Sequence, residues 1–356
     1  MRMTRQIKIG GVKIGGGAPI SIQSMAKTDT RDVSGTARQI KELAKAGCEI
    51  IRVAVKDFEA AEAIRAIKRR INLPLVADIH FDYRLALRAI ENGADKIRLN
   101  PGNIYKEDEI REVIKLAKKR KIPIRVGANS GSIRDRVKSK WQRANGKEQR
   151  AKDLVESVLG YIKVLERMDF YDIIVSLKAS DVISTVEAYK LFSKKSRYPL
   201  HLGVTAAGAV STGVVKSSIG IGALLLDGIG DTIRVSLTGD PIEEVIAAKN
   251  ILQALGLRNF GPEVISCPTC GRCQVDLQDI VEKIESGVKS QVAGCMTRVT
   301  SCKIAIMGCE VNGPGEAKEA DIGIACGKGS GVIFKKGKII KRVKEKDIVK
   351  ELLKNI

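Results

Sequence analysis

The sequence predicts an α/β protein in which a closed (β/α)8 barrel, the TIM-barrel fold, is followed by a smaller α+β domain. Three observations support this prediction. From Ile20 onward, short β-branched runs alternate with segments of helical periodicity, there are eight such runs, and seven of the eight cysteines lie beyond the last run. Alternating strands and helices form a parallel sheet, because each crossover needs a helix on the sheet face, and eight units close a barrel.

The strand-like runs are short and rich in Ile and Val. In chain order they are ISIQS (20–24), CEIIRVAV (48–55), LPLVADIH (73–80), DKIRLN (95–100), IPIRVGAN (122–129), YDIIVSLK (171–178), YPLHLGVT (198–205) and DTIRVSL (231–237). Segments such as ARQIKELAKAG and KDLVESVLGYIKVLERM have the apolar spacing of helices, and EEVIAAKNILQALG follows the eighth strand. An open doubly wound sheet is the main alternative, but no Gly-rich dinucleotide fingerprint follows the first strand.

The segments on either side of the barrel differ from it in composition. QIKIGGVKIGGG (6–17) predicts a small glycine-turn hairpin that caps the barrel bottom. We expect a barrel domain over 1–255, a linker over 256–264 and a second domain over 265–356. In the second domain QDIVEKIESGV predicts a helix, KIAIMG, DIGIA and GVIFKKGKIIKRV predict strands, and EKDIVKELLKNI predicts a final helix.

The net charge of +21 indicates an anionic partner: nucleic acid, an anionic membrane surface or a phosphorylated small molecule. The helix-like basic runs KLAKKRK (115–121) and KKGKIIKRVKEK (335–346) are interpreted as solvated faces without a function. Aromatic residues make up only 4%, which disfavours sequence-independent RNA binding. No apolar segment is typical of a signal peptide or a membrane span, so we expect a cytoplasmic protein whose thiols serve metal or redox chemistry.

Four of the eight strands carry an arginine between branched apolar residues, namely Arg52, Arg98, Arg125 and Arg234. We expect these arginines to point into the barrel, because a charge facing the helix layer would be buried without water. Polar residues also stand at the strand ends: Asp78, His80, Asn100, Asn129, Lys178, Thr205 and Ser236. Barrel active sites form at these ends, and guanidinium groups grip phosphate oxygens in pairs, so the mouth is predicted to bind a phosphate or diphosphate.

The cysteine spacing indicates a metal module. ISCPTCGRC contains Cys267, Cys270 and Cys273, and the later cysteines are Cys295, Cys302, Cys309 and Cys326. A zinc ribbon would need a second CxxC, and a two-cluster ferredoxin would need its fourth cysteine directly after the triplet. One cluster held by a CxxC pair and a distant ligand remains, with MGCEVNGPGE (307–316) as the favoured ligand loop. Cys48 is interpreted as a small buried hydrophobe, and the roles of Cys273, Cys295, Cys302 and Cys326 stay open.

The motifs ADIHFDYRLAL, IRLNPGN, RVGANSGS, VKSSIGIGALLLDGIGDTIRVSL, SCPTCGR and MGCEVNGPGEAKEADIGIA resemble, over nearly the whole chain, the bacterial 4-hydroxy-3-methylbut-2-en-1-yl diphosphate synthase family. These oxidoreductases are the iron–sulfur enzymes of the non-mevalonate isoprenoid pathway. The resemblance implies a TIM barrel that binds 2-C-methyl-D-erythritol 2,4-cyclodiphosphate, followed by an α+β iron–sulfur domain with one [4Fe-4S] cluster per chain. It implies two-electron reductive ring opening with loss of water, flavodoxin or ferredoxin as electron donor, and a head-to-tail homodimer.

The resemblance also implies roles for individual residues. Cluster ligands are expected at Cys267, Cys270, Cys309 and Glu316, with Cys302 as the substitute if Cys309 fails. Substrate contacts are expected at Arg52, Asp78, Arg98, Arg125, Asn129, Lys178, Arg234 and Ser236, and catalytic positions at His80, Thr205, Ala206 and Glu316. The alternative hypothesis is an RNA-binding or RNA-modifying protein with a structural metal module.

Two features depart from the family pattern. After the seventh strand the family reads VTEAG, whereas this chain reads VTAAG, so Ala206 stands where a glutamate is expected. The segment between Cys270 and Cys309 is also several residues longer than is common in the family.

Overall fold

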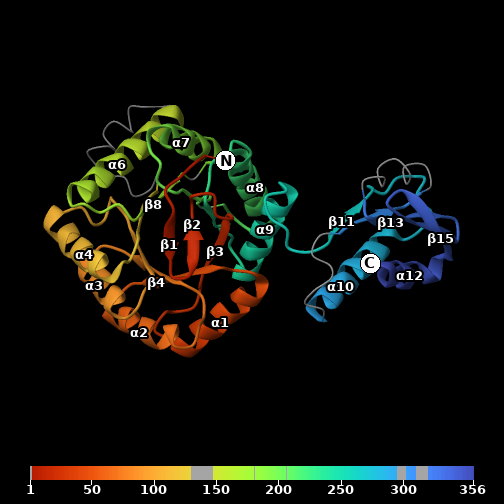
Figure 1. Ribbon diagram of the computed structural model, residues 1–356, viewed down its shortest axis with the longest axis horizontal. Coiled ribbons are helices and arrows are strands. Elements are labelled where there is room, and N and C mark those ends of the chain that lie inside the picture. Colours follow the sequence, from red (N-terminus) through yellow and green to blue (C-terminus); the bar gives the residue numbers. More distant parts are fainter. Residues whose placement is uncertain (1, 130–146, 180, 206, 295–301, 310–319) are drawn as a thin grey trace. The chain divides into compact units, whose positions relative to one another are not determined.

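The structure is a computed structural model of residues 1–356 (Figure 1). It describes all of them except residues 1, 130–146, 180, 206, 295–301 and 310–319, and it does not describe the side chains of 289–294. The chain divides into two compact units, Met1–Arg258 and Asn259–Ile356. Residues 256–264, predicted as a linker, include the start of the first strand of the second unit.

The first unit contains a parallel eight-stranded sheet. Its strands are β3 (Ser21–Met25), β4 (Ile50–Val55), β5 (Leu75–Ile79), β6 (Lys96–Leu99), β7 (Ile124–Asn129), β8 (Ile173–Lys178), β9 (His201–Leu202) and β10 (Thr232–Ile233). β3 pairs with both β4 and β10, and a parallel bridge between Val175 and Leu200 joins the two ends of the sheet. The predicted (β/α)8 TIM barrel is confirmed.

Helices form a ring around these strands (Figure 1). They are α1 (Val33–Ala46), α2 (Phe58–Lys68), α3 (Tyr83–Glu91), α4 (Glu107–Arg120), α6 (Lys147–Arg167), α7 (Val182–Lys195), α8 (Val210–Leu226) and α9 (Pro241–Ala254). Aspartates cap the N-termini of five of them by accepting a backbone N–H, namely Asp32, Asp57, Asp82, Asp181 and Asp240. These caps fix where each helix begins after the loop at the barrel mouth.

The predicted N-terminal hairpin consists of β1 (Ile7–Ile9) and β2 (Val12–Ile14). Its isoleucines pack against residues near the start of three barrel strands, in a buried cluster of Ile7, Ile9, Ile14, Ile50, Val76 and Ile174. The hairpin therefore fills the N-terminal end of the barrel with apolar side chains, and polar interior groups are left at the opposite end.

The last two barrel strands are shorter than predicted. β9 covers two residues of the predicted 198–205, and β10 covers two of the predicted 231–237. Gly203 has a φ of +157°, within the region that disfavours side chains. The Leu237 N–H donates to the Glu244 side chain from α9, so it does not extend the strand ladder. Here a side chain from the helix layer replaces sheet pairing.

The second unit is a five-stranded sheet in the order β11-β12-β13-β14-β15. The strands are β11 (Glu263–Ser266), β12 (Lys303–Met307), β13 (Ile322–Gly327), β14 (Ser330–Lys335) and β15 (Lys338–Lys344). β11, β12 and β13 are parallel to one another, and β14 runs antiparallel to both of its neighbours. Its helices are α10 (Leu277–Gly294) and α12 (Ile348–Asn355), with the 3-10 turn η2 (Glu345–Asp347) before α12.

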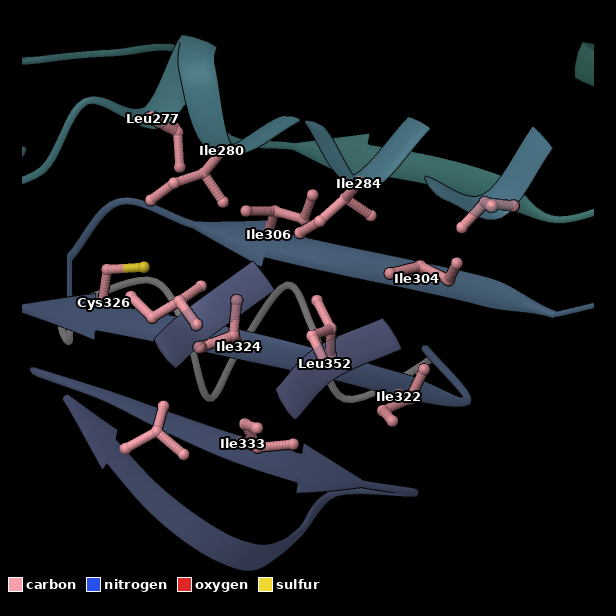
Figure 2. Close-up of a cluster of buried hydrophobic side chains, with 13 residues drawn as sticks. Leu277, Ile280, Ile284, Ile304, Ile306, Ile322, Ile324, Cys326, Ile333 and Leu352 are labelled. Atoms are coloured by element: carbon pink, nitrogen blue, oxygen red, sulfur yellow. The ribbon is translucent and has the colours of Figure 1, made fainter. Parts of the chain in front are cut away.

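Both helices pack on one face of this sheet. Figure 2 shows Leu277, Ile280 and Ile284 of α10 above Ile304, Ile306, Ile322, Ile324 and Ile333 of the strands, together with Leu352 of α12. A smaller cluster lies on the other face and consists of Ala305, Met307, Ala320 and Phe334. Leaving the helices on one side makes the two faces of the sheet chemically different.

Most of the basic run 335–346 is strand, as predicted for GVIFKKGKIIKRV (331–343), and not the helix-like solvated face. It crosses from β14 into β15 through a turn at Lys336 and Gly337, whose φ angles are +48° and +74°. Two consecutive residues with positive φ are typical of the tight hairpin turn that matches strand twist. The run 115–121, by contrast, lies in α4 and its C-cap.

Candidate functional site

The interior of the barrel carries a ring of charged side chains. Arg52, Asp78, Arg98, Arg125 and Lys178 are buried and come from five consecutive strands, β4 to β8. They alternate along their strands with apolar residues that face the helices, as the period of two requires. Lys96 from β6 and Arg234 from the segment after β10 complete the basic set.

Asp78 is the carboxylate at the centre of this ring. Its Oδ1 lies 3.2 Å from Arg98 Nη1, and its Oδ2 lies 3.6 Å from Arg52 Nε and 3.7 Å from His80 Nε2. Burial alone would raise the pKa of Asp78, but Arg52, then His80, Arg98 and Arg125, hold the pKa of that carboxyl well below its usual range. Asp78 is therefore ionised and fixes the guanidinium groups around it.

Glu244 performs the same task on the other side of the barrel. This α9 residue is 1% exposed at its side chain and reaches between β3 and β10. Its Oε2 accepts from Arg234 Nη2 at 3.2 Å and from Ser24 Oγ at 3.3 Å, and its Oε1 lies 3.4 Å from Lys27 Nζ. Sequence reasoning missed Glu244, although its position on the apolar stripe of α9 with Ala247, Ala248 and Ile251 was a usable signal.

Positive charge exceeds negative charge in the described part of this interior. Six basic side chains face two carboxylates: Arg52, Lys96, Arg98, Arg125, Lys178 and Arg234 against Asp78 and Glu244. Burial, assisted by Arg234 and Arg125, lowers the pKa of Lys178 well below its usual value. Burial lowers the pKa of Arg52 to about 10, with Asp78 opposing the shift. The ring is thus short of anions.

Buried hydrogen-bond donors without partners also indicate that the ring lacks anions. Within the described residues, Nε and Nη1 of Arg125 and Nε of Arg98 are buried without a hydrogen-bond partner. A buried donor without a partner costs free energy, on the order of 1–3 kcal/mol. Close packing fixes the ring: a Cβ at Gly203 would lie 2.6 Å from Lys178 Nζ, and one at Gly127 would lie 2.9 Å from Arg98 Nε. The arrangement can bind a small polyanion with several negatively charged oxygens.

The remaining predicted site residues have different positions. The His80 side chain is 42% exposed beside Asp78, and Asn129 ends β7, where it pairs in register with Lys178. Thr205 and Ser236 are half-buried beyond the short strands β9 and β10. Asn100 is buried, and its Oδ1 accepts a hydrogen bond from the Gly102 N–H at 3.0 Å. Ala206 and Glu316 lie outside the described residues.

In the second unit, thiols gather at one end of the sheet. Cys267 directly follows β11, and Cys309 follows β12. Because these parallel strands are neighbours, the two cysteines lie at the same end of the sheet although they are 42 positions apart in the sequence. The Gly308 N–H donates to Cys267 Sγ at 3.2 Å. Cys270 is exposed in the loop that connects β11 to α10.

Cys273 has different surroundings. Its thiol donates to the Val275 carbonyl at 3.4 Å, and a Cβ added to Gly308 would lie 2.6 Å from its sulfur. Cys326 is buried, and burial raises the pKa of its thiol to about 12. Cys302 is half-buried against the hydrophobic cluster between the two helices and the sheet, and Cys295 lies outside the described residues. Among the described residues no three His, Cys, Asp or Glu side chains converge as a metal site.

The fold and the two sites define a class of protein: a TIM barrel with an anion-deficient basic mouth, joined to an α+β unit that carries thiols at one sheet edge. In the part of the chain that the structure describes, no helix is long and apolar enough to span a membrane.

Comparison with known proteins identifies the family within this class. The profile of the GcpE TIM-barrel domain matches residues 4–249, and that of the GcpE protein C-terminal domain matches residues 263–356. The chain is 56% identical to the 4-hydroxy-3-methylbut-2-en-1-yl diphosphate synthase (flavodoxin) of Caldanaerobacter subterraneus, over 100% of this chain and 97% of the relative. It is 54% identical to that of Thermodesulfovibrio yellowstonii, over 100% and 98%. The chain therefore belongs to the 4-hydroxy-3-methylbut-2-en-1-yl diphosphate synthase (GcpE) family, as its motifs predicted.

A solved structure of Plasmodium falciparum HPPK-DHPS is similar to the barrel, with a TM-score of 0.50 and 14% identity over 71% of this chain and 50% of that chain. At this identity the similarity shows a shared fold alone. The relatives' names give no support to the alternative of an RNA-binding protein.

Proposed function

We propose that this chain is an oxidoreductase of isoprenoid biosynthesis that opens the ring of 2-C-methyl-D-erythritol 2,4-cyclodiphosphate. Two electrons and two protons enter, a C–O bond to the diphosphate breaks, and 4-hydroxy-3-methylbut-2-enyl diphosphate and one water leave. The excess of buried positive charge at the barrel mouth carries the proposal. A cyclic diphosphate supplies the anionic oxygens that this ring lacks, and the relatives are named as synthases of a diphosphate.

The proposed substrate contacts are the side chains of the basic ring and its rim. Arg52, Arg98, Arg125, Lys178 and Arg234 would bind the diphosphate, with Asp78, Asn129 and Ser236 orienting them or the substrate. When the ring opens, negative charge develops on the diphosphate oxygen, and donors already fixed by Asp78 and Glu244 stabilise that charge without reorganising. Arg234 is one of these fixed donors, because its hydrogen bonds to the Glu244 carboxylate, at 3.2–3.4 Å, set the orientation of its guanidinium group.

The second unit fits a thiolate-bound iron–sulfur cluster in its donor chemistry. Cys267 and Cys309 stand at adjacent strand ends, Cys270 is accessible, and the Gly308 N–H faces the Cys267 sulfur. We propose that Cys267, Cys270, Cys309 and Glu316 hold one [4Fe-4S] cluster, with Cys302 as the alternative to Cys309. When bound, the cluster supplies single electrons and a site for a substrate oxygen.

Protons must be supplied by residues near the reacting carbon atoms. His80, which lies 3.7 Å from Asp78, and Thr205 stand at the barrel mouth and are proposed to orient or protonate the substrate, as is Glu316 from the cluster domain. Ala206 replaces the glutamate that the family carries after the seventh strand. We infer that this chain turns over more slowly than a relative with that carboxylate.

We also propose the partners that the family implies. Reduced flavodoxin or ferredoxin donates the electrons, and a head-to-tail homodimer brings the cluster domain of one chain to the barrel of the other. Cytoplasmic location and the absence of nucleic-acid and membrane partners remain predictions.

The experiment is an analysis of the chain purified anaerobically. We expect iron and acid-labile sulfide at about four each per chain, and binding of the cyclodiphosphate in preference to RNA. Stoichiometric zinc without sulfide, together with RNA binding, would replace the proposal by the RNA-binding alternative.

A further inference from the structure

The edge strand β15 carries an exposed strip of basic and apolar side chains. β15 ends the five-stranded sheet, so one side of its backbone pairs with no strand among the residues that the structure describes. Ile339 is 69% exposed and Ile340 is 45% exposed, beside exposed Lys338, Arg342 and Lys344. We call these five residues the β15 strip. Exposed isoleucines on an unpaired edge would favour unwanted association unless a partner covers them, and lysines limit that association.

Strand pairing places most of the strip on the sheet face without helices. Arg342 pairs with Val332 and Ile339 pairs with Phe334, a member of the small cluster on that face. The neighbouring pair, Ile333 and Lys341, belongs to the helix-covered face, where Lys341 forms an ion pair with Glu351 of α12. Ile340 has no partner in the ladder, because a β-bulge at this point shifts the register.

Arg342 and Lys344 lie toward the end of the sheet that carries the thiols, whereas Lys338 and Ile339 pair with Lys335 and Phe334 at the opposite end. Lys344 pairs with Ser330, and Ser330 pairs with Gly327 at the end of β13. β13 is parallel to β12, which ends two residues before Cys309. Three strand spacings separate β12 from β15, which is about 14 Å at 4.7–4.9 Å each. A redox group in a protein docked over Arg342 and Lys344 would therefore be close to the thiol end of the sheet.

The charges of the strip are available to a partner. Among the described residues, no carboxylate lies within ion-pair distance of Lys338, Arg342 or Lys344, whereas Lys341 is paired with Glu351. An exposed cation without a partner can attract an acidic surface over about 10 Å at ordinary ionic strength.

We propose that the β15 strip is the docking surface for an acidic electron-carrier protein, of the kind that the word flavodoxin in the relatives' names denotes. The inference rests on the proposed function, because it assumes a redox group at Cys267, Cys270 and Cys309. Each docking transfers one electron from the reduced carrier, so two dockings supply the two electrons of a turnover. Arg342 and Lys344 steer the acidic carrier, and the two isoleucines supply apolar contact area.

Two other occupants fit the strip less well. The proposed homodimer brings the cluster domain of one chain to the barrel of another, and that barrel mouth is itself basic, so it offers a basic strip no complementary charge. Nucleic acid would be met by aromatic side chains on which bases stack, and the strip offers isoleucines instead. An acidic protein surface matches both the charge and the apolar content.

The test uses the cluster-loaded chain with two electron sources. Arg342→Glu with Lys344→Glu should raise the KM for a purified reduced flavodoxin by about tenfold, since rim charges govern association. Turnover driven by reduced methyl viologen, a small molecule that needs no docking surface, should stay equal to that of the unmodified chain. The control reverses two exposed lysines of α4, Lys115→Glu with Lys119→Glu, which makes the same change in net charge on the barrel.

Binding of oxidised flavodoxin, measured by calorimetry without substrate, gives a readout independent of turnover. We expect the strip variant to weaken the Kd by about the same factor and the control to change it less than twofold. Equal effects of the two variants, an unchanged Kd, or tighter binding of a single-stranded RNA at the strip would overturn the proposal. A change from dimer to monomer in the strip variant would assign the surface to a second copy instead. If the unmodified chain shows no viologen-driven turnover, the proposed function fails while the docking result still stands.

Discussion

Replacing Asp78 with asparagine tests whether the basic ring depends on a buried carboxylate. Asp78→Asn preserves the shape of the side chain but removes the charge that lies 3.2 Å from Arg98 and 3.6 Å from Arg52. Removing one partner from a buried ion pair costs about 3–5 kcal/mol, because the other charge stays buried. At about 2–4 °C per kcal/mol for a domain of this size, we expect the Tm of the barrel to fall by roughly 6–20 °C.

The assay is thermal unfolding of the full chain followed by circular dichroism, with and without inorganic diphosphate. Diphosphate should restore more of the lost Tm in Asp78→Asn than it adds to the unmodified chain, because the variant has a larger excess of positive charge. The control is Asp29→Asn. Asp29 makes shorter ion pairs, 2.7 Å to Arg31 and 2.9 Å to Lys56, but they are exposed, so its Tm should hardly change. Equal decreases in Tm for the two variants would refute the reasoning, because burial of the carboxylate would then have no influence on the stability.

Three further predictions concern the chemistry. Cys309→Ala should lose iron and sulfide while Cys273→Ala keeps both; the reverse outcome in metal analysis would exchange their roles. Ala206→Glu should raise turnover by about a hundredfold, the usual scale of an acid–base group, and an unchanged kcat would mean that the position is not catalytic here. Diphosphate binding should take up protons, because the bound anion raises the pKa of Lys178 from its lowered value. The affinity for diphosphate should then fall as the pH rises through the pKa that Lys178 has in the complex. Calorimetry in two buffers of different ionisation enthalpy measures the uptake, and none would contradict the account.

The barrel could be predicted because its signals are local. Each strand is a β-branched run, each helix has its own apolar stripe, and the parallel order follows from their alternation. The arginines could be placed by the same reasoning, since a period of two and the cost of burying a charge leave the barrel interior as their position. The N-terminal hairpin was also predictable, from glycines between short apolar runs.

Other features depend on contacts that sequence patterns do not reveal. The apolar stripe of α9 indicates that Glu244 is buried, but its hydrogen bonds with Arg234 and Ser24 follow only from the way α9 packs on the barrel. β11 is four residues long and precedes the CxxC loop directly, so its first two residues fall within the predicted linker. The strand predicted over 331–343 is two strands, because the turn at Lys336 and Gly337 folds it into a hairpin, and only the sheet order shows that β15 is an edge strand.

The most direct test of the central claim is anaerobic turnover of the cluster-loaded chain on 2-C-methyl-D-erythritol 2,4-cyclodiphosphate with a counted supply of electrons. We expect one 4-hydroxy-3-methylbut-2-enyl diphosphate for every two electrons consumed, at a low rate, and no product from Arg125→Ala at the same cluster content. A loaded chain that consumes no electrons in the presence of this substrate, or that forms product equally well without Arg125, would contradict that claim.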